Sequence, residues 1–394
     1  MIEAKRTAVL NVYPSRRGGG AQSVFNNTYL YFKEHKEYVS YCGSFDNDSE
    51  LKLTRSSFGF CNIIKTTKFI RENKVQIFHF HGGITLGVLY PLLFLYIAFN
   101  QKLKCIFTAH NYAIVCPSQK RFDYNKNEIC DKCSSSFSFF KYFYSNCEKK
   151  NIILKLAKWS YKVSLNIGLR GSRVKILTPS EFSANALMRN STYDVFSVGN
   201  PVDFSNVVLE ENDLINEAKP SRICFLGRFV KEKGIELLSR EIRRNKSYYT
   251  NKEIILIGDG PEKSKLKCEL THLNISFKDF GFCGKNEIQG ILATCKVIVV
   301  PSVWDETFGL VAAEGIFNRC VPVVSNRGAL QEIITKAKIG YVFDVEVDDS
   351  LHHAIELSIN NYKSIDWKGV LNKFSYKLSD YNYFHIIEGV YKRD

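Results

Sequence analysis

The stretch VIVVPSVWDETFGLVAAE, residues 297–314, carries the strongest signal in the chain. Its first four residues predict a buried strand, and from Gly309 a helical pattern runs to about Asn318. A strand that turns into a helix at a glycine presents backbone N–H groups and the positive end of the helix dipole, which favour an anion. Glu306 and Glu314 flank this turn and would accept hydrogen bonds from hydroxyl groups. The combination predicts a ligand with both an anion and hydroxyls, such as a nucleoside diphosphate sugar.

Further glycine turns follow predicted strands in the C-terminal half. Gly227 and Arg228 end one apolar run, and Lys233 follows five residues later. A tight turn lets the two cations converge on one point, as a diphosphate requires. Gly258 ends a second strand and Phe282 follows a third, where a flat base has room against backbone. Because open α/β sheets bind ligands at the carboxyl ends of their strands, we expect these turns to meet in one site.

Three motifs give the chain a family resemblance. GRFVKEKG (227–234), IGDGP (257–261) and PSVWDETFGLVAAEG (301–315) resemble the retaining glycosyltransferases of family 4, which have the GT-B fold. TPSEFS (178–183) and NPVD (200–203) stand where such enzymes have similar segments, so the resemblance covers nearly the whole chain. It implies an α/β protein whose two Rossmann-like domains face one another across a cleft.

The resemblance also implies roles for single residues. Arg228 and Lys233 would hold the donor diphosphate and assist catalysis. Glu306 would contact the transferred sugar and Glu314 the ribose. Backbone contacts to sugar and phosphate would come from Phe308, Gly309 and Leu310. Sugar transfer with retained configuration would then need neither a metal nor a protein nucleophile. The alternative for the two acids is a favourable interaction with the helix dipole alone.

Length and pattern predict two domains. A chain of 394 residues exceeds most single domains, and strands alternate with helices before a polar stretch and again after it. We expect an N-terminal acceptor-binding domain over residues 1–203 and a C-terminal nucleotide-sugar-binding domain over 204–375, joined by a linker at 205–221. The family likeness implies that residues 376–394 cross back onto the first domain.

Two segments of the N-terminal half are candidates for the acceptor side of the site. Gly19 and Gly20 belong to a run of three glycines before a helix, and the resemblance places this run beside the diphosphate and acceptor; a flexible loop is the alternative. His110 ends a strand, and the resemblance places it near the donor sugar. We expect His81 to be a better ligand candidate than His79, which should face the core.

Charge is distributed unevenly. Residues 1–200 hold 28 Lys or Arg and 13 Asp or Glu, a net charge of +15, whereas the remainder holds 26 and 27, a net charge of −1. The basic half predicts an anionic partner, either nucleic acid or a membrane leaflet. No nucleic-acid reader motif is present, which favours the membrane.

Two apolar segments bear on membrane contact. Ile84–Phe99 is shorter than the roughly 20 residues that span a bilayer and predicts a core helix. Residues 148–166 predict an amphipathic helix with Lys155, Lys158 and Lys162 on one face and apolar residues on the other, suited to anionic lipid; an ordinary surface helix is the alternative. With no secretory signal visible, we expect a cytoplasmic protein, peripheral at the inner face of the cytoplasmic membrane.

Four of the twelve cysteines, Cys116, Cys130, Cys133 and Cys147, surround a Cys-x2-Cys pair in a loop-rich insertion. They predict either a structural zinc site or reduced thiols.

The function that the sequence favours is transfer of a sugar from a UDP- or GDP-sugar to a lipid-linked glycan in bacterial surface polysaccharide synthesis, with no cofactor. The alternatives are a nucleotide-sugar epimerase of the same architecture and a basic membrane- or nucleic-acid-binding protein without catalysis.

Overall fold

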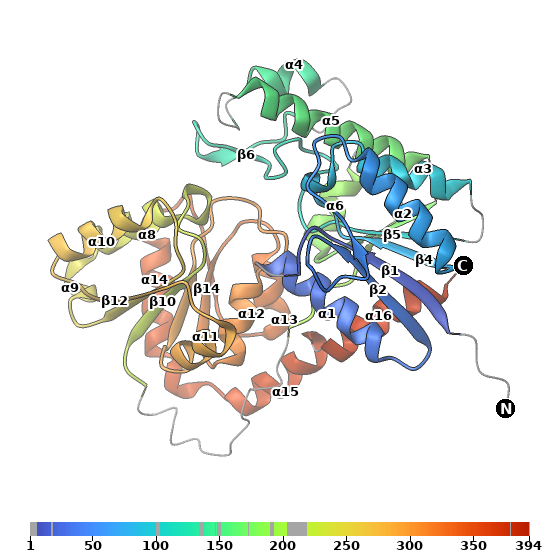
Figure 1. The fold of residues 1–394 in the computed structure, drawn as a ribbon. Coiled ribbons are helices and arrows are strands. Elements are labelled where there is room, and N and C mark those ends of the chain that lie inside the picture. The colour runs from blue at the N-terminus through green and yellow to red at the C-terminus, as the bar shows by residue number, and fades with distance from the viewer. Residues whose placement is uncertain are drawn as a thin grey trace. The chain divides into compact units, whose positions relative to one another are not determined.

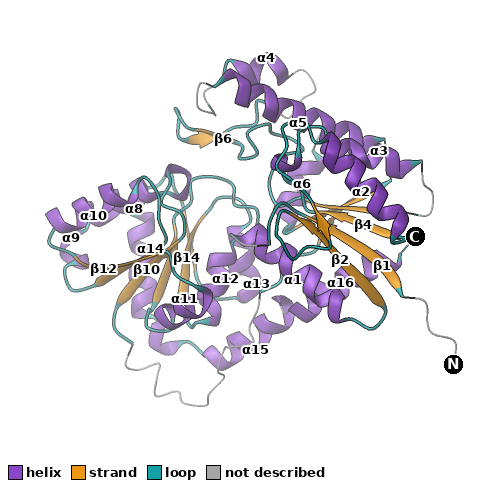
Figure 2. Ribbon diagram, in the orientation of Figure 1, coloured by secondary structure: helices purple, strands orange, loops and turns teal. Residues whose placement is uncertain are grey.

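The computed structural model describes residues 6–16, 19–99, 103–133, 138–145, 147, 151–171, 173–189, 193–202, 219–378 and 380–393. The chain divides into two compact units. Unit 1 comprises Met1–Asp123, Cys130–Pro201 and Tyr381–Asp394, and unit 2 comprises Tyr124–Ile129 and Val202–Asp380. Each unit has a parallel sheet covered by helices, as the predicted α/β class requires (Figures 1 and 2). Most of the expected linker, residues 205–218, lies outside the described residues.

The sheet of unit 1 has seven strands in the order β3-β2-β1-β4-β5-β8-β9, all parallel. The strands are β1 Thr7–Val12, β2 Tyr38–Ser44, β3 Leu51–Lys52, β4 Ile77–Phe80, β5 Lys104–Thr108, β8 Val174–Thr178 and β9 Val195–Ser197. The apolar pattern of the sequence predicts strands at residues 7–13, 75–79, 104–109, 174–178 and 194–198, and it misses β2 and β3. Chain order reverses between β1 and β4, and ligands bind at such reversals in open α/β sheets.

Helices cover both faces of this sheet. The helices of unit 1 are α1 Gly20–Glu34, α2 Phe60–Glu72, α3 Leu93–Ala98, α4 Ser138–Phe143, α5 Ile152–Arg170, α6 Glu181–Met188 and α16 Asp380–Lys392, of which α4 packs on α5. A separate two-stranded sheet consists of β6 Phe122–Asp123 and β7 Glu128–Ile129. Alternate residues of a strand point to opposite faces. Phe78 and Phe80 therefore pack in the same cluster as Leu165 of α5, whereas Ile77 packs in the same cluster as Ile387 of α16.

The predicted core helix over Ile84–Phe99 is wrong as a single helix. The segment is buried, but it breaks into the 3-10 turns η1 Ile84–Leu86 and η2 Tyr90–Leu92 before α3. Gly87 has φ 122°, and a Cβ there would overlap the backbone of Gly59. Pro91, which has no N–H to donate, stands at the start of η2. Hydropathy thus predicted the burial, while glycine and proline ended the helix.

The sheet of unit 2 has six parallel strands in the order β12-β11-β10-β13-β14-β15. The strands are β10 Arg222–Leu226, β11 Glu253–Ile257, β12 Ser276–Gly281, β13 Val297–Val300, β14 Val321–Ser325 and β15 Tyr341–Phe343. The apolar pattern of the sequence predicts strands at residues 222–226, 253–257, 275–280, 297–300 and 321–325, and it misses the short β15. Here chain order reverses between β10 and β13, so the turns after these two strands are adjacent.

The helical segments of unit 2 are η3 Lys231–Lys233, α8 Ile235–Arg244, α9 Lys246–Tyr249, α10 Lys263–His272, α11 Lys285–Leu292, α12 Leu310–Phe317, α13 Leu330–Ala337, α14 Ser350–Asn360, η4 Tyr362–Ser364 and α15 Trp367–Leu378. Helix α12 begins directly after Gly309 and ends before Asn318, as predicted. In the described part of the chain, no helix combines the length and apolarity that a bilayer span needs.

Candidate functional site

Glycines let the turns at the carboxyl ends of the unit 2 strands pack backbone against backbone. Gly258 has φ 114°, and a Cβ there would overlap the carbonyl oxygen of Gly227. Gly234 has φ 73°, and its Cβ would overlap the carbonyl oxygen of Pro301. These contacts bring the turn after β11 against the turn after β10, and the start of α8 against the turn after β13. The predicted convergence of these turns is therefore present within unit 2.

The centre of this cluster is an ion pair between Lys233 and Glu306. The Lys233 Nζ lies 2.5 Å from Glu306 Oε1, and the Ser302 hydroxyl donates to the same oxygen at 2.6 Å. The Lys233 ammonium also lies 5.4 Å from the centre of the Trp304 ring. Burial alone would raise the pKa of Glu306, but the ammonium and the hydrogen bonds bring it below its ordinary value. Glu306 is therefore a carboxylate at neutral pH and a hydrogen-bond acceptor.

The backbone of Glu306 is fixed by the turn after β14, which the sequence analysis did not single out. The Ala329 N–H donates to the Glu306 carbonyl oxygen at 2.9 Å. Gly328 has φ 63°, and a Cβ there would overlap the backbone of Glu306. A glycine in the turn after β14 was the available signal.

The start of α12 lies in the same part of unit 2. Gly309 takes the N-cap position with φ 111°, and no side chain caps the helix. The Phe308 side chain is buried in the core, which leaves its backbone for the predicted ligand contact. Leu310 is half-buried at the first position of the helix. One turn further on, burial raises the pKa of Glu314 to about 7, while the Lys285 ammonium opposes this shift.

Arg228 and Phe282 are both exposed, as ligand contacts would be. Phe282 is 88% exposed at the end of β12. The Gly258 N–H donates to the Gly281 carbonyl oxygen at 2.6 Å, so this end of β12 is joined to the turn after β11. Lys263 braces the same turn by donating to the Gly258 carbonyl oxygen at 2.8 Å. Sequence reasoning missed this lysine, which is the first residue of α10.

The candidate residues of unit 1 lie at the reversal between β1 and β4. His79 is fully buried and contacts the Tyr391 hydroxyl of α16 at 2.8 Å. The His81 Nδ1 lies 3.2 Å from His110 Nε2. Burial lowers the pKa of His110 to about 4, so the imidazole is neutral at pH 7. His81 is only 1% exposed, which argues against its predicted ligand contact, whereas His110 is partly exposed.

Gly19 and Gly20, at the start of α1, are open to solvent. Gly20 begins the helix, and Gly19 is its N-cap with an ordinary φ of −81°. A Cβ at Gly19 would lie no closer than 3.9 Å to the nearest atom, in Gln22. Neither backbone strain nor packing inside unit 1 therefore requires glycine at position 19.

Comparisons with known proteins agree with this geometry. Residues 210–366 match the family described as Glycosyl transferases group 1. An uncharacterised 41.2 kDa protein in a cps region of Klebsiella pneumoniae is 24% identical over 344 residues, which cover 83% of this chain and 84% of the relative. The chain therefore carries a group 1 glycosyltransferase domain in its C-terminal half.

Solved structures show that the glycosyltransferase has the GT-B fold. HepE of Anabaena, solved in complex with UDP, superposes with a TM-score of 0.70 at 14% identity over 98% of this chain and 99% of HepE. WaaG, a glycosyltransferase involved in lipopolysaccharide biosynthesis, superposes with a TM-score of 0.64 at 11% identity over 98% of this chain and all of WaaG. The predicted resemblance to surface-polysaccharide glycosyltransferases and the predicted fold class are confirmed.

The four insertion cysteines of the glycosyltransferase do not form a metal site in the structure. All twelve cysteines are thiols rather than disulfides. The Cys116 Sγ lies 3.1 Å from the Ser118 hydroxyl, and the Cys147 Sγ lies 3.0 Å from the Ser145 hydroxyl. Among the described residues, which include Cys130 and Cys133, no three metal-binding side chains are grouped as a metal requires.

The predicted basic face of the amphipathic helix is wrong. The helix forms as α5, but Lys155 is buried, and its ammonium donates to the carbonyl oxygens of Phe143 and Ser145 at 2.9 and 2.7 Å. Lys162 donates to the Cys133 carbonyl oxygen at 2.6 Å. Helical spacing predicts which residues share a face but not which face is buried. Here carbonyl oxygens of adjacent segments accept hydrogen bonds from the lysines.

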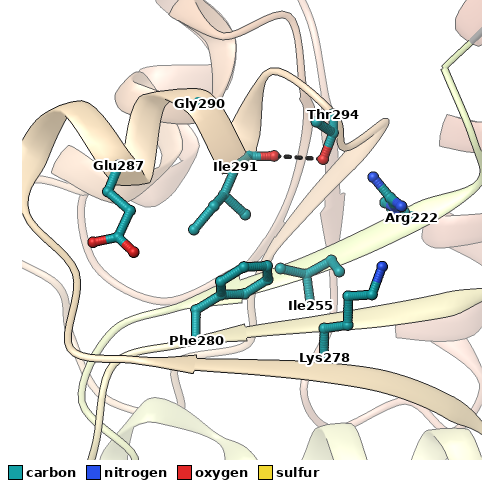
Figure 3. Close-up of a pocket in the computed structure, with 8 residues that line it drawn as sticks. All are labelled: Arg222, Ile255, Lys278, Phe280, Glu287, Gly290, Ile291 and Thr294. Atoms are coloured by element: carbon teal, nitrogen blue, oxygen red, sulfur yellow. Dashed lines mark hydrogen bonds between the residues drawn. The ribbon is translucent and has the colours of Figure 1, made fainter.

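Unit 2 also has a pocket of about 240 Å³ (Figure 3). None of the candidate donor-binding residues lines it. It lies beside α11 and strands β11 and β12, and its lining residues are Arg222, Ile255, Lys278, Phe280, Glu287, Gly290, Ile291 and Thr294. Arg222 and Lys278 both pair with Glu253, at 2.5 and 3.2 Å. Because β10 and β11 begin at Arg222 and Glu253, this ion-pair cluster marks the amino ends of the strands and not the edge that carries Glu306.

Proposed function

We propose that this glycosyltransferase moves a sugar from a UDP- or GDP-sugar to a lipid-linked glycan with retained anomeric configuration, in bacterial surface polysaccharide synthesis at the inner face of the cytoplasmic membrane. The observation that carries the proposal is the Lys233–Glu306 pair at the reversal between β10 and β13. It puts a cation suited to phosphate within hydrogen-bond distance of a carboxylate suited to sugar hydroxyls.

In the proposed reaction, the chain stabilises the departing diphosphate. Arg228, Lys233 and the N-terminus of α12 supply positive charge as negative charge grows on the phosphate oxygen during cleavage of its bond to the sugar. Losing one such preorganised donor costs about 3 kcal/mol of transition-state stabilisation. The acceptor hydroxyl attacks the anomeric carbon from the face that the phosphate leaves, and its proton passes to the departing phosphate oxygen.

Within this scheme the carboxylates bind hydroxyl groups. Glu306, ionised and held by Lys233 and Ser302, orients the transferred sugar, and Glu314 receives the ribose hydroxyls. A glycosidase would instead require a protonated acid opposite a carboxylate. The lowered pKa of Glu306 is contrary to an acid role for it.

The relatives support the choice of donor and setting. HepE was solved with UDP, WaaG acts in lipopolysaccharide biosynthesis, and the Klebsiella relative is encoded in a cps region. The net charge of +15 over residues 1–200 supports an acceptor that is carried by an anionic membrane.

A labelled-donor assay tests the proposal. The purified chain is incubated with labelled UDP- and GDP-sugars and a bacterial lipid extract, and the linkage formed is read by NMR. We expect label to enter the lipid fraction with the donor's anomeric configuration. An isomerised donor without transfer would indicate the epimerase, and an inverted linkage would contradict retention.

Glu306→Gln provides the matched variant for this assay. We expect transfer to fall about a hundredfold, because the neutral amide loses the charged hydrogen bonds to the sugar and the pairing with Lys233. Glu253→Gln is the control, since Glu253 also has an ion pair of 2.5 Å but lies at the amino ends of the strands. Equal transfer activity of the two variants would show that Glu306 has no role in donor binding or transfer.

A further inference from the structure

Helix α4 packs on α5 in unit 1 (Figure 1), and apolar side chains on and between these helices are exposed to solvent. We call this surface the apolar tip and define it by Phe140, Tyr144, Ile152, Ile153 and Leu156. Ile153 is 79% exposed and Tyr144 is 86% exposed. Single exposed apolar residues are ordinary on protein surfaces, whereas a contiguous group of them marks an interaction site.

The tip is not a misplaced part of the core. The two helices already pack on each other through Phe139 and Trp159, whose ring centres lie 4.9 Å apart. Further along α5, Tyr161 and Leu165 are buried against the sheet of unit 1. Lys155, which helical spacing would place outside, is instead buried among carbonyl oxygens. The helix thus buries a lysine and leaves isoleucines in water.

Charge around the tip identifies its partner. The sequence of residues 138–170 contains seven Lys or Arg and a single acid, although two of the seven, Lys155 and Lys162, donate to carbonyl oxygens. Lys141, on α4 between two of the apolar tip residues in sequence, is exposed. Apolar and aromatic side chains within a basic segment suit an anionic bilayer, into which the rings and aliphatic chains insert while lysines pair with headgroups. Two copies of this surface would repel one another through the same lysines.

We propose that the apolar tip docks the glycosyltransferase on an anionic membrane by inserting its side chains between lipid headgroups. The inference rests on the proposed function in one respect, because a lipid-linked acceptor lies in that membrane. The docking surface expected from sequence was the basic face of α5. The surface proposed here is instead an apolar one, on a segment rich in basic residues.

Sedimentation with vesicles tests the docking without donor or acceptor. The full chain is mixed with vesicles of phosphatidylethanolamine containing one quarter phosphatidylglycerol, or of phosphatidylcholine alone. We expect binding to the anionic vesicles, and binding at least about tenfold weaker to phosphatidylcholine, since each lysine near an anionic surface contributes attraction. Equal binding to both lipids would contradict the role of charge, and no binding to either would overturn the proposal.

Variants separate the apolar from the basic contribution. The double variant Ile152→Glu, Ile153→Glu should lose about tenfold or more in affinity for anionic vesicles, and Lys141→Glu should lose several-fold. Ile386→Glu is the control, because Ile386 is exposed on α16, which packs on the opposite face of the same sheet. An unchanged double variant, or an equal loss in the control, would refute the tip as the docking surface.

Two further readouts keep the outcomes distinct. Sedimentation equilibrium without lipid should show the same monomer for the wild type and the double variant; a wild-type dimer that the double variant dissociates would reassign the tip to self-association. Transfer to a soluble acceptor should be equal in both proteins. If transfer is absent from both while vesicle binding differs, the proposed function fails and the docking surface stands.

Discussion

At the scale of single residues, the site depends on how neighbours set the charge of two glutamates. Glu306 is ionised because Lys233 and Ser302 offset the effect of burial on its pKa. At Glu314 the Lys285 ammonium offsets burial only in part, and burial raises the pKa of Glu314 to about 7. The same residue type eight positions apart therefore has two protonation states near neutral pH, which suits Glu306 to a constant hydrogen-bond acceptor role.

The shifted pKa of Glu314 predicts a pH-dependent stability. Its folded-state pKa of about 7 lies above the ordinary value of 4.5, so its contribution to stability is fully present below pH 4.5 and is lost as pH rises through 7. Glu314→Gln, which cannot ionise, should therefore be more stable than the wild type at pH 8, by about 1–3 kcal/mol, and equally stable at pH 4. Urea unfolding at the two pH values checks this; a constant difference between the proteins would contradict the shift.

At the scale of elements, the site is a set of strand ends held together by glycine turns. Most of this could be predicted from sequence, because apolar runs that end in glycine mark strand ends, and parallel strands share an edge. The turn at Gly328 was missed because the glycine, although visible in the sequence, does not show that the turn approaches Glu306. Helix α5 was predicted, but its buried face was not, because the carbonyl oxygens that accept hydrogen bonds from Lys155 lie 12 and 10 residues away in sequence.

The turn after β14 gives a prediction at this scale. Gly328→Ala should destabilise the chain by about 1–3 kcal/mol, because φ is positive and a Cβ would overlap the backbone of Glu306, and it should also lower transfer by displacing that residue. Gly290→Ala is the control, since its Cβ would meet no atom within 4 Å inside α11 and should stabilise the helix by about 0.5–1 kcal/mol. Thermal unfolding measures both; equal stability of the two variants would contradict the packing argument.

At the scale of the whole molecule, the two units have the same architecture and different chemistry. Each has a parallel sheet with one reversal of strand order, and each presents its candidate residues at that reversal. Unit 2 has the ion pair suited to a charged donor, while unit 1 contributes neutral, largely buried histidines and the basic, apolar tip. The separation fits the proposed function, in which unit 2 recognises the donor and unit 1 recognises a membrane-carried acceptor.

The central claim is that cations of unit 2 hold the diphosphate while Glu306 holds the attached sugar. Calorimetric titration tests it with three ligands, the nucleoside, the nucleoside diphosphate and the nucleotide sugar, in the base series that the donor assay selects. Arg228→Gln should bind the diphosphate about 10- to 100-fold more weakly and the nucleoside unchanged, as expected when a charged hydrogen bond is lost. Glu306→Gln should bind the diphosphate as the wild type does and lose about tenfold for the nucleotide sugar. If both variants bound all three ligands like the wild type, the account would be wrong.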